Sequence, residues 1–309
     1  MLSEFIKDIL KKITNKQNID NDIQNVNQCI SSLISDIYFY DKIQYLINNK
    51  GKRIRSILSL YYYYRYYNKN SYNIEELYNI LTIVELTHFA SLLHDDVIDN
   101  STSRRYEKSF NYLYGNKNSI LIGDYLLISV FNNLLKILNN KQYSKYIVNQ
   151  FIKASTDTAY GAYLEHNLKL NNIPNASKFN VEDYLRITRL KTGSLFKFSC
   201  MSGCRLSNTH FNDIKKSANF GLIFGIIYQI QNDLNDYKYT SYKESEDYMQ
   251  HHITVPVVIL QSITDIQDIF NNKTQENFNK IKGLISTEKF KQSLNKFIDK
   301  HINYILATV

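Results

Sequence analysis

Apolar residues recur at three-and-four spacing over long uninterrupted stretches of the chain, and this feature restricts its fold the most. The clearest stretches are 76–99, 119–138, 142–169 and 211–236. Such spacing places apolar side chains along one face of an α-helix. Only two prolines and nine glycines interrupt the 309 residues, and the alternation typical of half-buried strands is almost absent. The sequence therefore predicts an all-α protein.

Nothing in the composition divides the chain. We find no internal repeat and no linker, so we expect a single domain over residues 1–309. The net charge is +8, but the long basic run or basic–aromatic interleaving of a nucleic-acid-binding protein is missing. We therefore expect no nucleic-acid partner and favour anionic small molecules.

Location is predicted from apolar runs, the first residues and the cysteines. No apolar run reaches membrane-spanning length, and residues 1–16 mix acidic and basic side chains as an amphipathic helix does. Cys29, Cys200 and Cys204 do not form the paired C-x-x-C motifs of a metal site, and three such cysteines favour a reducing compartment. These features predict a cytoplasmic protein without a transmembrane segment. An organellar location and a peripheral membrane contact stay open.

The segment "HDDVIDNSTSRR" crowds like charges at the end of an apolar stretch. Asp95 and Asp99 are four residues apart, so they share one face of a helix and repel each other. Magnesium would offset this repulsion, because it prefers oxygen ligands and completes its coordination with substrate phosphates. Arg104 and Arg105 follow, and arginine suits forked contacts with phosphate. The segment predicts a metal–diphosphate site, with a solvated acidic helix end as the alternative.

A second segment, "YQIQNDLNDY", repeats this arrangement at the end of another apolar stretch. Asn232 and Asp236 are four residues apart, with Asp233 between them. Two such helices facing each other would form a cage for several metal ions.

Six segments together resemble the motifs of trans-type isoprenyl diphosphate synthases of the long-chain branch, most clearly over residues 45–260. In family order they are "GKRIR" (51–55), "DDVID" (95–99) with "RR" (104–105), "GNKNSILIGDYLL" (115–127), "KTGSL" (191–195), "YQIQNDLND" (228–236) and "HITVP" (252–256). The resemblance implies a single-domain helical bundle with a central cavity. It also implies a homodimer, with a heteromer left open.

The implied reaction condenses isopentenyl diphosphate with an allylic diphosphate, such as farnesyl or geranylgeranyl diphosphate, to give a linear all-trans polyprenyl diphosphate. Up to three Mg²⁺ ions would be held by Asp95, Asp99, Asn232 and Asp236. Isopentenyl diphosphate would be bound by Lys52, Arg55, His88 and Arg105. The allylic diphosphate would be bound by Arg104, Lys191 and Lys243. The allylic cation would be stabilised by Thr192, Gln229 and the carbonyl of Lys191.

A long product is expected from the residues one turn before the first aspartate. At a rise of about 1.5 Å per residue, Ser91 lies about 6 Å below Asp95 on nearly the same helix face, with Ala90 beside it. In the family, bulky side chains at these positions close the product tunnel early, whereas small ones let it deepen. By resemblance, Phe131 is the next candidate for the tunnel floor. Small residues needed only for helix packing are the alternative.

Four departures from the family pattern keep other functions open. Asn232 replaces an aspartate, His251 and His252 replace glycine and lysine, Lys50 replaces the first of two glycines, and "GAYLE" places Ala162 and Glu165 where Glu and Gln are familiar. They would also suit a weakly active or non-catalytic subunit of a heteromeric synthase. A class I terpene cyclase and a pure binding protein are further alternatives.

Overall fold

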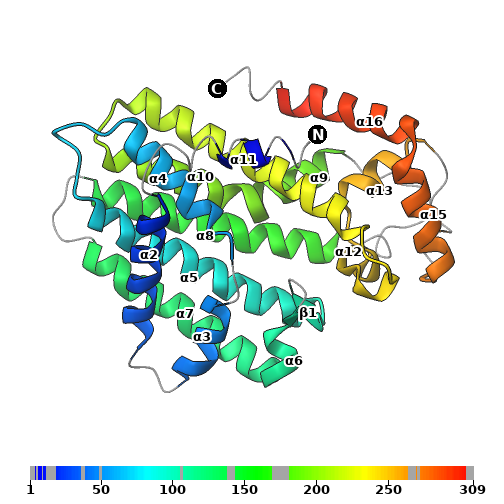
Figure 1. Cartoon of the computed structure of the whole chain (residues 1–309), viewed down its shortest axis with the longest axis horizontal. Coiled ribbons are helices and arrows are strands. Elements are labelled where there is room, and N and C mark those ends of the chain that lie inside the picture. The colour runs from blue at the N-terminus through cyan, green and yellow to red at the C-terminus, as the bar shows by residue number, and fades with distance from the viewer. Residues whose placement is uncertain are drawn as a thin grey trace. The chain divides into compact units, whose positions relative to one another are not determined.

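The computed structural model describes residues 4, 6–8, 10–11, 19–35, 39–48, 51–104, 107–137, 143–168, 181–263, 269 and 272–303. Over these ranges the chain is helical apart from turns, loops and one short hairpin (Figure 1), which confirms the all-α prediction. The chain divides into two compact units. The N-unit comprises Glu4–Ser155 and Leu195–Gly221, and the C-unit comprises Met1–Ser3, Thr156–Ser194 and Leu222–Val309. A single domain stays a prediction.

The N-unit is built around α5 (Ile74–Ile98), which packs along α7 (Asn116–Ile137) and also contacts α2 (Ile19–Ile34) and α4 (Ile54–Arg65). Asn73 caps the start of α5, because its side-chain oxygen accepts a hydrogen bond from the backbone N–H of Glu75. Buried apolar residues lie on most sides of α5, so it forms the core helix of this unit.

The N-unit contains further elements among the described residues. They are α3 (Tyr40–Asn48), β1 (Ser103–Arg104), β2 (Glu107–Lys108), α6 (Phe110–Tyr114) and most of α10 (Ser194–Leu206). The two strands pair antiparallel, with Ser103 opposite Lys108. Two long helices, α8 (Ser144–Asn167) and α11 (Phe211–Asp236), contribute residues to both units.

The C-unit has α13 (Val255–Leu260) in contact with α9 (Val181–Thr188), α15 (Gln275–Ser286) and α16 (Glu288–Ile298). All residues of α13 are buried, which makes this short helix the centre of the unit. The other elements are the π-helical turn η2 (Arg189–Gly193), the 3₁₀ turn η3 (Tyr242–Glu244), α12 (Glu246–Gln250) and the π-helical turn η4 (Asp299–Asn303).

The four stretches with helical apolar spacing correspond to α5, α7, α8 and α11, and their bounds agree within a few residues. Of the predicted amphipathic segment 1–16, residues 4, 6–8 and 10–11 are helical, and the others lie outside the described residues.

One helix bears on the expectation that the chain has no transmembrane segment. The segment Asn116–Leu135 of α7 is long and apolar enough to cross a membrane, judged by length and composition alone. One third of it, 33%, is buried within the protein. A core helix of a bundle passes the same test, so length and composition alone do not define a membrane span.

Candidate active site

The first aspartate motif lies in the last turns of α5, in the N-unit. Asp96, which is only 2% exposed, is held on two sides. Its Oδ1 accepts from Nη2 and Nε of Arg104 at 2.5 and 2.7 Å, and its carbonyl accepts from Nδ2 of Asn111 at 3.1 Å. Arg104, predicted to contact the allylic diphosphate, is therefore anchored beside the motif by the middle aspartate.

The crowding of like charges expected from the sequence is present in this motif. Burial raises the pKa of the Asp96 carboxyl, Arg104 opposes that rise, and the charges of Asp95 and Asp99 add to it. Asp99 caps the helix and is 8% exposed. Asn100 follows with φ 51, and this left-handed residue turns the chain away after the last carboxylate.

Asp95 and Asp99 are suited to magnesium by the chemistry of their oxygen donors. Among the described residues, no three carboxylates, imidazoles or thiolates converge to enclose a metal by themselves. Magnesium usually takes only one or two carboxylates and keeps waters or substrate phosphates as its other ligands. Two carboxylates on one helix face fit this coordination, but they are too few for a site in which the protein supplies every ligand.

The cationic residues of the N-unit begin at the turn before α4. Lys52 is exposed, and the half-buried Arg55 places its guanidinium carbon 4.4 Å from the ring centroid of Phe196. This stacking leaves the edge of the guanidinium as its donor side. His88 lies on α5, between this turn and the aspartates in sequence, and is partly buried. Arg105 lies outside the described residues.

The residues predicted to set chain length differ in burial. Ala90 is fully buried, and the hydroxyl of Ser91 donates to the carbonyl of His88 at 2.8 Å. Phe131 is 49% exposed, so in one copy of the chain its ring does not form the floor of a buried tunnel. It lies beside, and not on, the buried stripe of α7, which consists of Ile122, Leu126, Val130 and Leu134. The tunnel itself stays a prediction.

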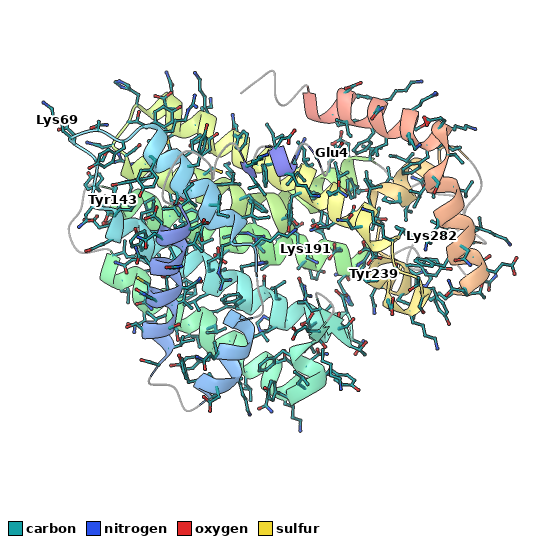
Figure 2. The ribbon with its side chains drawn as sticks, in the orientation of Figure 1. Glu4, Lys69, Tyr143, Lys191, Tyr239 and Lys282 are labelled. Atoms are coloured by element: carbon teal, nitrogen blue, oxygen red, sulfur yellow. The ribbon has the colours of Figure 1, made fainter. Side chains whose placement is uncertain are left out.

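The second group of predicted residues lies in the C-unit. Lys191 and Thr192 lie on η2, a π-helical turn of a kind often found at functional sites. The ammonium of Lys191, which is labelled in Figure 2, forms an ion pair with Glu165 of α8. The backbone of this turn packs against Gly161, where a Cβ atom would lie 2.3 Å from the backbone nitrogen of Lys191.

A chain of hydrogen bonds connects Thr192 to the second aspartate motif. Oγ1 of Thr192 donates to Oε1 of Gln229 at 2.9 Å, and Nε2 of Gln229 donates to Oδ1 of Asp233 at 2.8 Å. Asp233 also accepts from the Tyr184 hydroxyl at 2.8 Å and from the Val255 N–H at 3.1 Å. Burial, and then the nearby Asp247 charge, raise the pKa of Asp233. The structure thus brings together two residues predicted to stabilise the cation.

The two predicted metal ligands on α11 have different surroundings. Asn232 is exposed to solvent, whereas Asp236 is half buried. The Asp236 carboxylate accepts from the Ser245 hydroxyl and, at 3.2 Å, from the Asp247 N–H. These two donors fix the orientation of its side chain. Lys243 is exposed on η3, where its N–H donates to Ser241 Oγ at 3.3 Å.

The departure from the family pattern at His251 and His252 has a structural counterpart. His251 has φ 57, in the left-handed region that favours glycine, which accounts for the glycine common at this position. His252 is buried, with Nδ1 3.2 Å from Oδ1 of Asp247. An imidazole thus stands beside a carboxylate at the position where the family usually carries lysine.

Sequence reasoning missed Tyr184, Ser245 and Asp247, which surround the second motif in the C-unit. Tyr184 and Asp247 line a pocket together with Lys191, Thr192 and others of this group. None of the three belongs to a motif that spacing alone would single out. The predicted residues fall into the N-unit or the C-unit, and a cage between two facing helices stays a prediction.

Comparison with known proteins defines the class of this chain. The family model described as Polyprenyl synthetase matches residues 37–288. The chain belongs to this family. It is 38% identical over 155 residues to a decaprenyl-diphosphate synthase of Dictyostelium discoideum, covering 50% of this chain and 31% of that protein. It is 31% identical over 222 residues to a prenyl transferase of Cyanidium caldarium, covering 71% of this chain and 65% of that protein.

These matches span less than two thirds of the length of both relatives. Among solved structures, a polyprenyl synthase of Caulobacter crescentus in complex with calcium and isoprenyl diphosphate has a TM-score of 0.79 and 22% identity, covering 97% of this chain and 92% of that one. At this identity the similarity establishes the fold, which is that of an all-α prenyl synthase.

Proposed function

We propose that this protein condenses isopentenyl diphosphate with an allylic diphosphate to make a linear, all-trans, long-chain polyprenyl diphosphate. The observation that carries this proposal is the intact first aspartate motif, with Asp95 and Asp99 at the end of α5 and Arg104 anchored beside them by Asp96. The names of the relatives, decaprenyl-diphosphate synthase among them, support a long product.

In the first step, the bond between the allylic carbon and the diphosphate oxygen breaks, and its electron pair leaves with the diphosphate. Magnesium held by Asp95, Asp99, Asn232 and Asp236 would supply Lewis-acid neutralisation of that leaving group. Arg104, Lys191 and Lys243 would bind the same diphosphate through charge-assisted hydrogen bonds. Fixed charges of this kind usually make the largest contribution to catalysis.

The allylic cation that remains needs dipoles and no nucleophile that would trap it. The Thr192–Gln229–Asp233 hydrogen-bond chain supports this role, because each side chain is already oriented by its partner. The double bond of isopentenyl diphosphate then attacks the cation and forms the new carbon–carbon bond. This attack gives a new carbocation, which loses a proton from the adjacent isopentenyl carbon to the released diphosphate. A new allylic double bond forms, and the chain is longer by one unit.

Isopentenyl diphosphate would be bound in the N-unit, by Lys52, Arg55, His88 and Arg105. A diphosphate without bound metal requires cationic partners, and arginine offers them in a planar fork. The exposed Lys52 and the stacked Arg55 guanidinium support this assignment.

Incorporation of radiolabelled isopentenyl diphosphate by the purified chain tests the proposal. With farnesyl diphosphate and Mg²⁺ we expect label in an extractable prenyl product, and with a chelator we expect none. Release of diphosphate from farnesyl diphosphate alone, with a cyclic hydrocarbon as product, would identify a terpene cyclase instead.

A non-catalytic subunit of a heteromeric synthase is the second candidate, and Asn232 is the observation that favours it. A neutral amide binds magnesium more weakly than a carboxylate does. In that case the chain alone would incorporate no label, and it would raise the activity of a separate synthase subunit on mixing.

We further propose that two copies of the chain associate. Along α7, an exposed apolar surface consists of Ile120, Leu121, Tyr125, Ile128, Phe131 and Leu135. Exposed apolar surface of this extent is typical of interfaces. Sedimentation should give a dimer, and Leu121→Lys with Ile128→Lys should give a folded monomer. A monomeric wild type that binds vesicles would assign the surface to a membrane.

A further inference from the structure

A charged side chain is buried in the turn between the two cationic residues that begin the candidate isopentenyl diphosphate site. Arg53 follows Lys52 directly, is 7% exposed, and has φ 48 as the residue that caps α4. Its Nε donates to Oδ1 of Asn27 at 3.0 Å, and its guanidinium carbon lies 4.8 Å from the ring centroid of Phe89. The left-handed backbone directs this guanidinium into the N-unit while Lys52 stays exposed.

One buried carboxylate holds both sides of this turn. Glu85 of α5 is 2% exposed. Its Oε2 lies 3.5 Å from Nη1 of Arg53, and its Oε1 accepts from the Ser56 hydroxyl at 2.6 Å. Because residues 53 and 56 both contact Glu85, the backbone of the intervening Arg55 is held on both sides. The family resemblance assigns no role to Glu85.

Stability alone gives little reason for such an arrangement. Desolvation of two buried charges largely cancels their attraction, and apolar replacements are often equally stable. Glu85 is one helical turn before His88 on α5, the helix that also carries Asp95. It therefore connects the cationic turn to the helix of the first metal motif.

We propose that Glu85 is a positioning residue for isopentenyl diphosphate. Through Arg53 and Ser56 it fixes the turn, so that Lys52 and Arg55 present their charges to the diphosphate together. This inference rests on the proposed function, and it adds a residue that does not touch the substrate.

Calorimetric titration of the metal-free full chain with isopentenyl diphosphate tests the inference. Glu85→Gln keeps the shape of the side chain and an acceptor for Ser56, but it removes the charge that orients Arg53. We expect the Kd to rise about tenfold, as for one misaligned charge-assisted contact. In turnover, the KM for isopentenyl diphosphate should rise by the same factor, while the KM for the allylic diphosphate should not change.

Asp22→Asn is the matched control. Asp22 is also a buried carboxylate of the N-unit, and it accepts from the hydroxyls of Tyr64 on α4 and Tyr78 on α5, at 2.9 and 2.5 Å. Asp22 lies on α2, and from there it connects α4 and α5 at a place away from the turn. We expect Asp22→Asn to lower the thermal midpoint and to keep the Kd within about twofold. The milder Ser56→Ala, which removes one of the two attachments, should give an intermediate Kd.

The inference is overturned if Glu85→Gln binds isopentenyl diphosphate as the wild type does, or if the Asp22→Asn control weakens binding equally. Inorganic pyrophosphate is titrated in parallel. If the wild type binds pyrophosphate but not isopentenyl diphosphate, the proposed substrate is wrong, and the pyrophosphate affinities of the variants still decide the positioning role. A wild type that binds neither anion contradicts both proposals.

Discussion

Gly161 of α8 lies directly against the backbone of Lys191: a Cβ atom on this glycine would approach the Lys191 nitrogen to 2.3 Å. Real side chains do not tolerate that distance from a backbone atom, so the π-helical turn can pack here only because residue 161 has no side chain. One turn farther along α8, Glu165 pairs with the Lys191 ammonium. Two residues of one helix therefore fix both the backbone and the side chain of Lys191.

Gly161→Ala should displace this turn. We expect a loss of about 1–3 kcal/mol in the free energy of unfolding, as for other overpacked sites. The KM for the allylic diphosphate should rise together with a fall in kcat, because Lys191 and Thr192 move as one turn. Gly283→Ala on α15 is the control, because its Cβ would meet nothing within 4 Å. Its free energy of unfolding should rise by up to about 1 kcal/mol. Equal behaviour of the two variants in denaturant titration would contradict the packing argument.

Asp95→Ala and Asp99→Ala should each reduce turnover on the order of 10²-fold or more, because each removes a proposed magnesium ligand. The charges of Asp95 and Asp99 raise the pKa of the buried Asp96, so loss of either charge relieves repulsion in the metal-free protein. Unfolding midpoints measured with a chelator should therefore stay the same or rise. Substantial activity of both variants at saturating magnesium would rule out the metal assignment.

Asn232→Asp restores the carboxylate that the family usually carries. Since Asn232 is exposed, the substitution should fold without difficulty. In a working enzyme it should lower the magnesium concentration for half-maximal activity by roughly threefold, because a charged oxygen binds the ion more tightly than an amide does. An unchanged magnesium dependence would show that this position does not bind the metal.

The helices were predictable because their apolar spacing is long and regular. The stretches 76–99 and 211–236 match α5 and α11 closely, since burial of an apolar face determines both the pattern and the helix. Motif order also identified Thr192 and Gln229, which the structure joins by a hydrogen bond of 2.9 Å. Local motifs could therefore single out residues that the structure places together, and the catalytic role of these two residues stays a prediction.

Contacts between segments distant in sequence could not be found in this way. The pairing of Glu85 with Arg53 joins residues 32 positions apart, and that of Tyr184 with Asp233 joins residues 49 apart. The apolar periodicity of the sequence does not indicate which distant residues pair. The π-helical form of the turn at Lys191 was equally hidden, because helical spacing does not distinguish π from α geometry over five residues.

Replacing Ala90 and Ser91 together by Phe should shift products to short chains. Both residues lie about one turn before Asp95 on α5, so large rings there would block elongation and leave the first condensation intact. Because Ala90 is fully buried, the single Ala90→Phe variant should also lose stability, and Ser91→Phe alone separates the two effects. Chromatography of dephosphorylated products measures the shift. Unchanged product length would show that the growing chain takes another path.

The product of the unmodified chain tests the central claim most directly. The purified protein is incubated with farnesyl diphosphate, excess radiolabelled isopentenyl diphosphate and Mg²⁺, and the dephosphorylated products are separated by chain length. We predict linear all-trans alcohols longer than geranylgeraniol, and their complete loss in Asp95→Ala. Products that end at geranylgeranyl length would contradict the open tunnel, and no incorporation at all by the chain alone would contradict the claim that this chain is itself a catalyst.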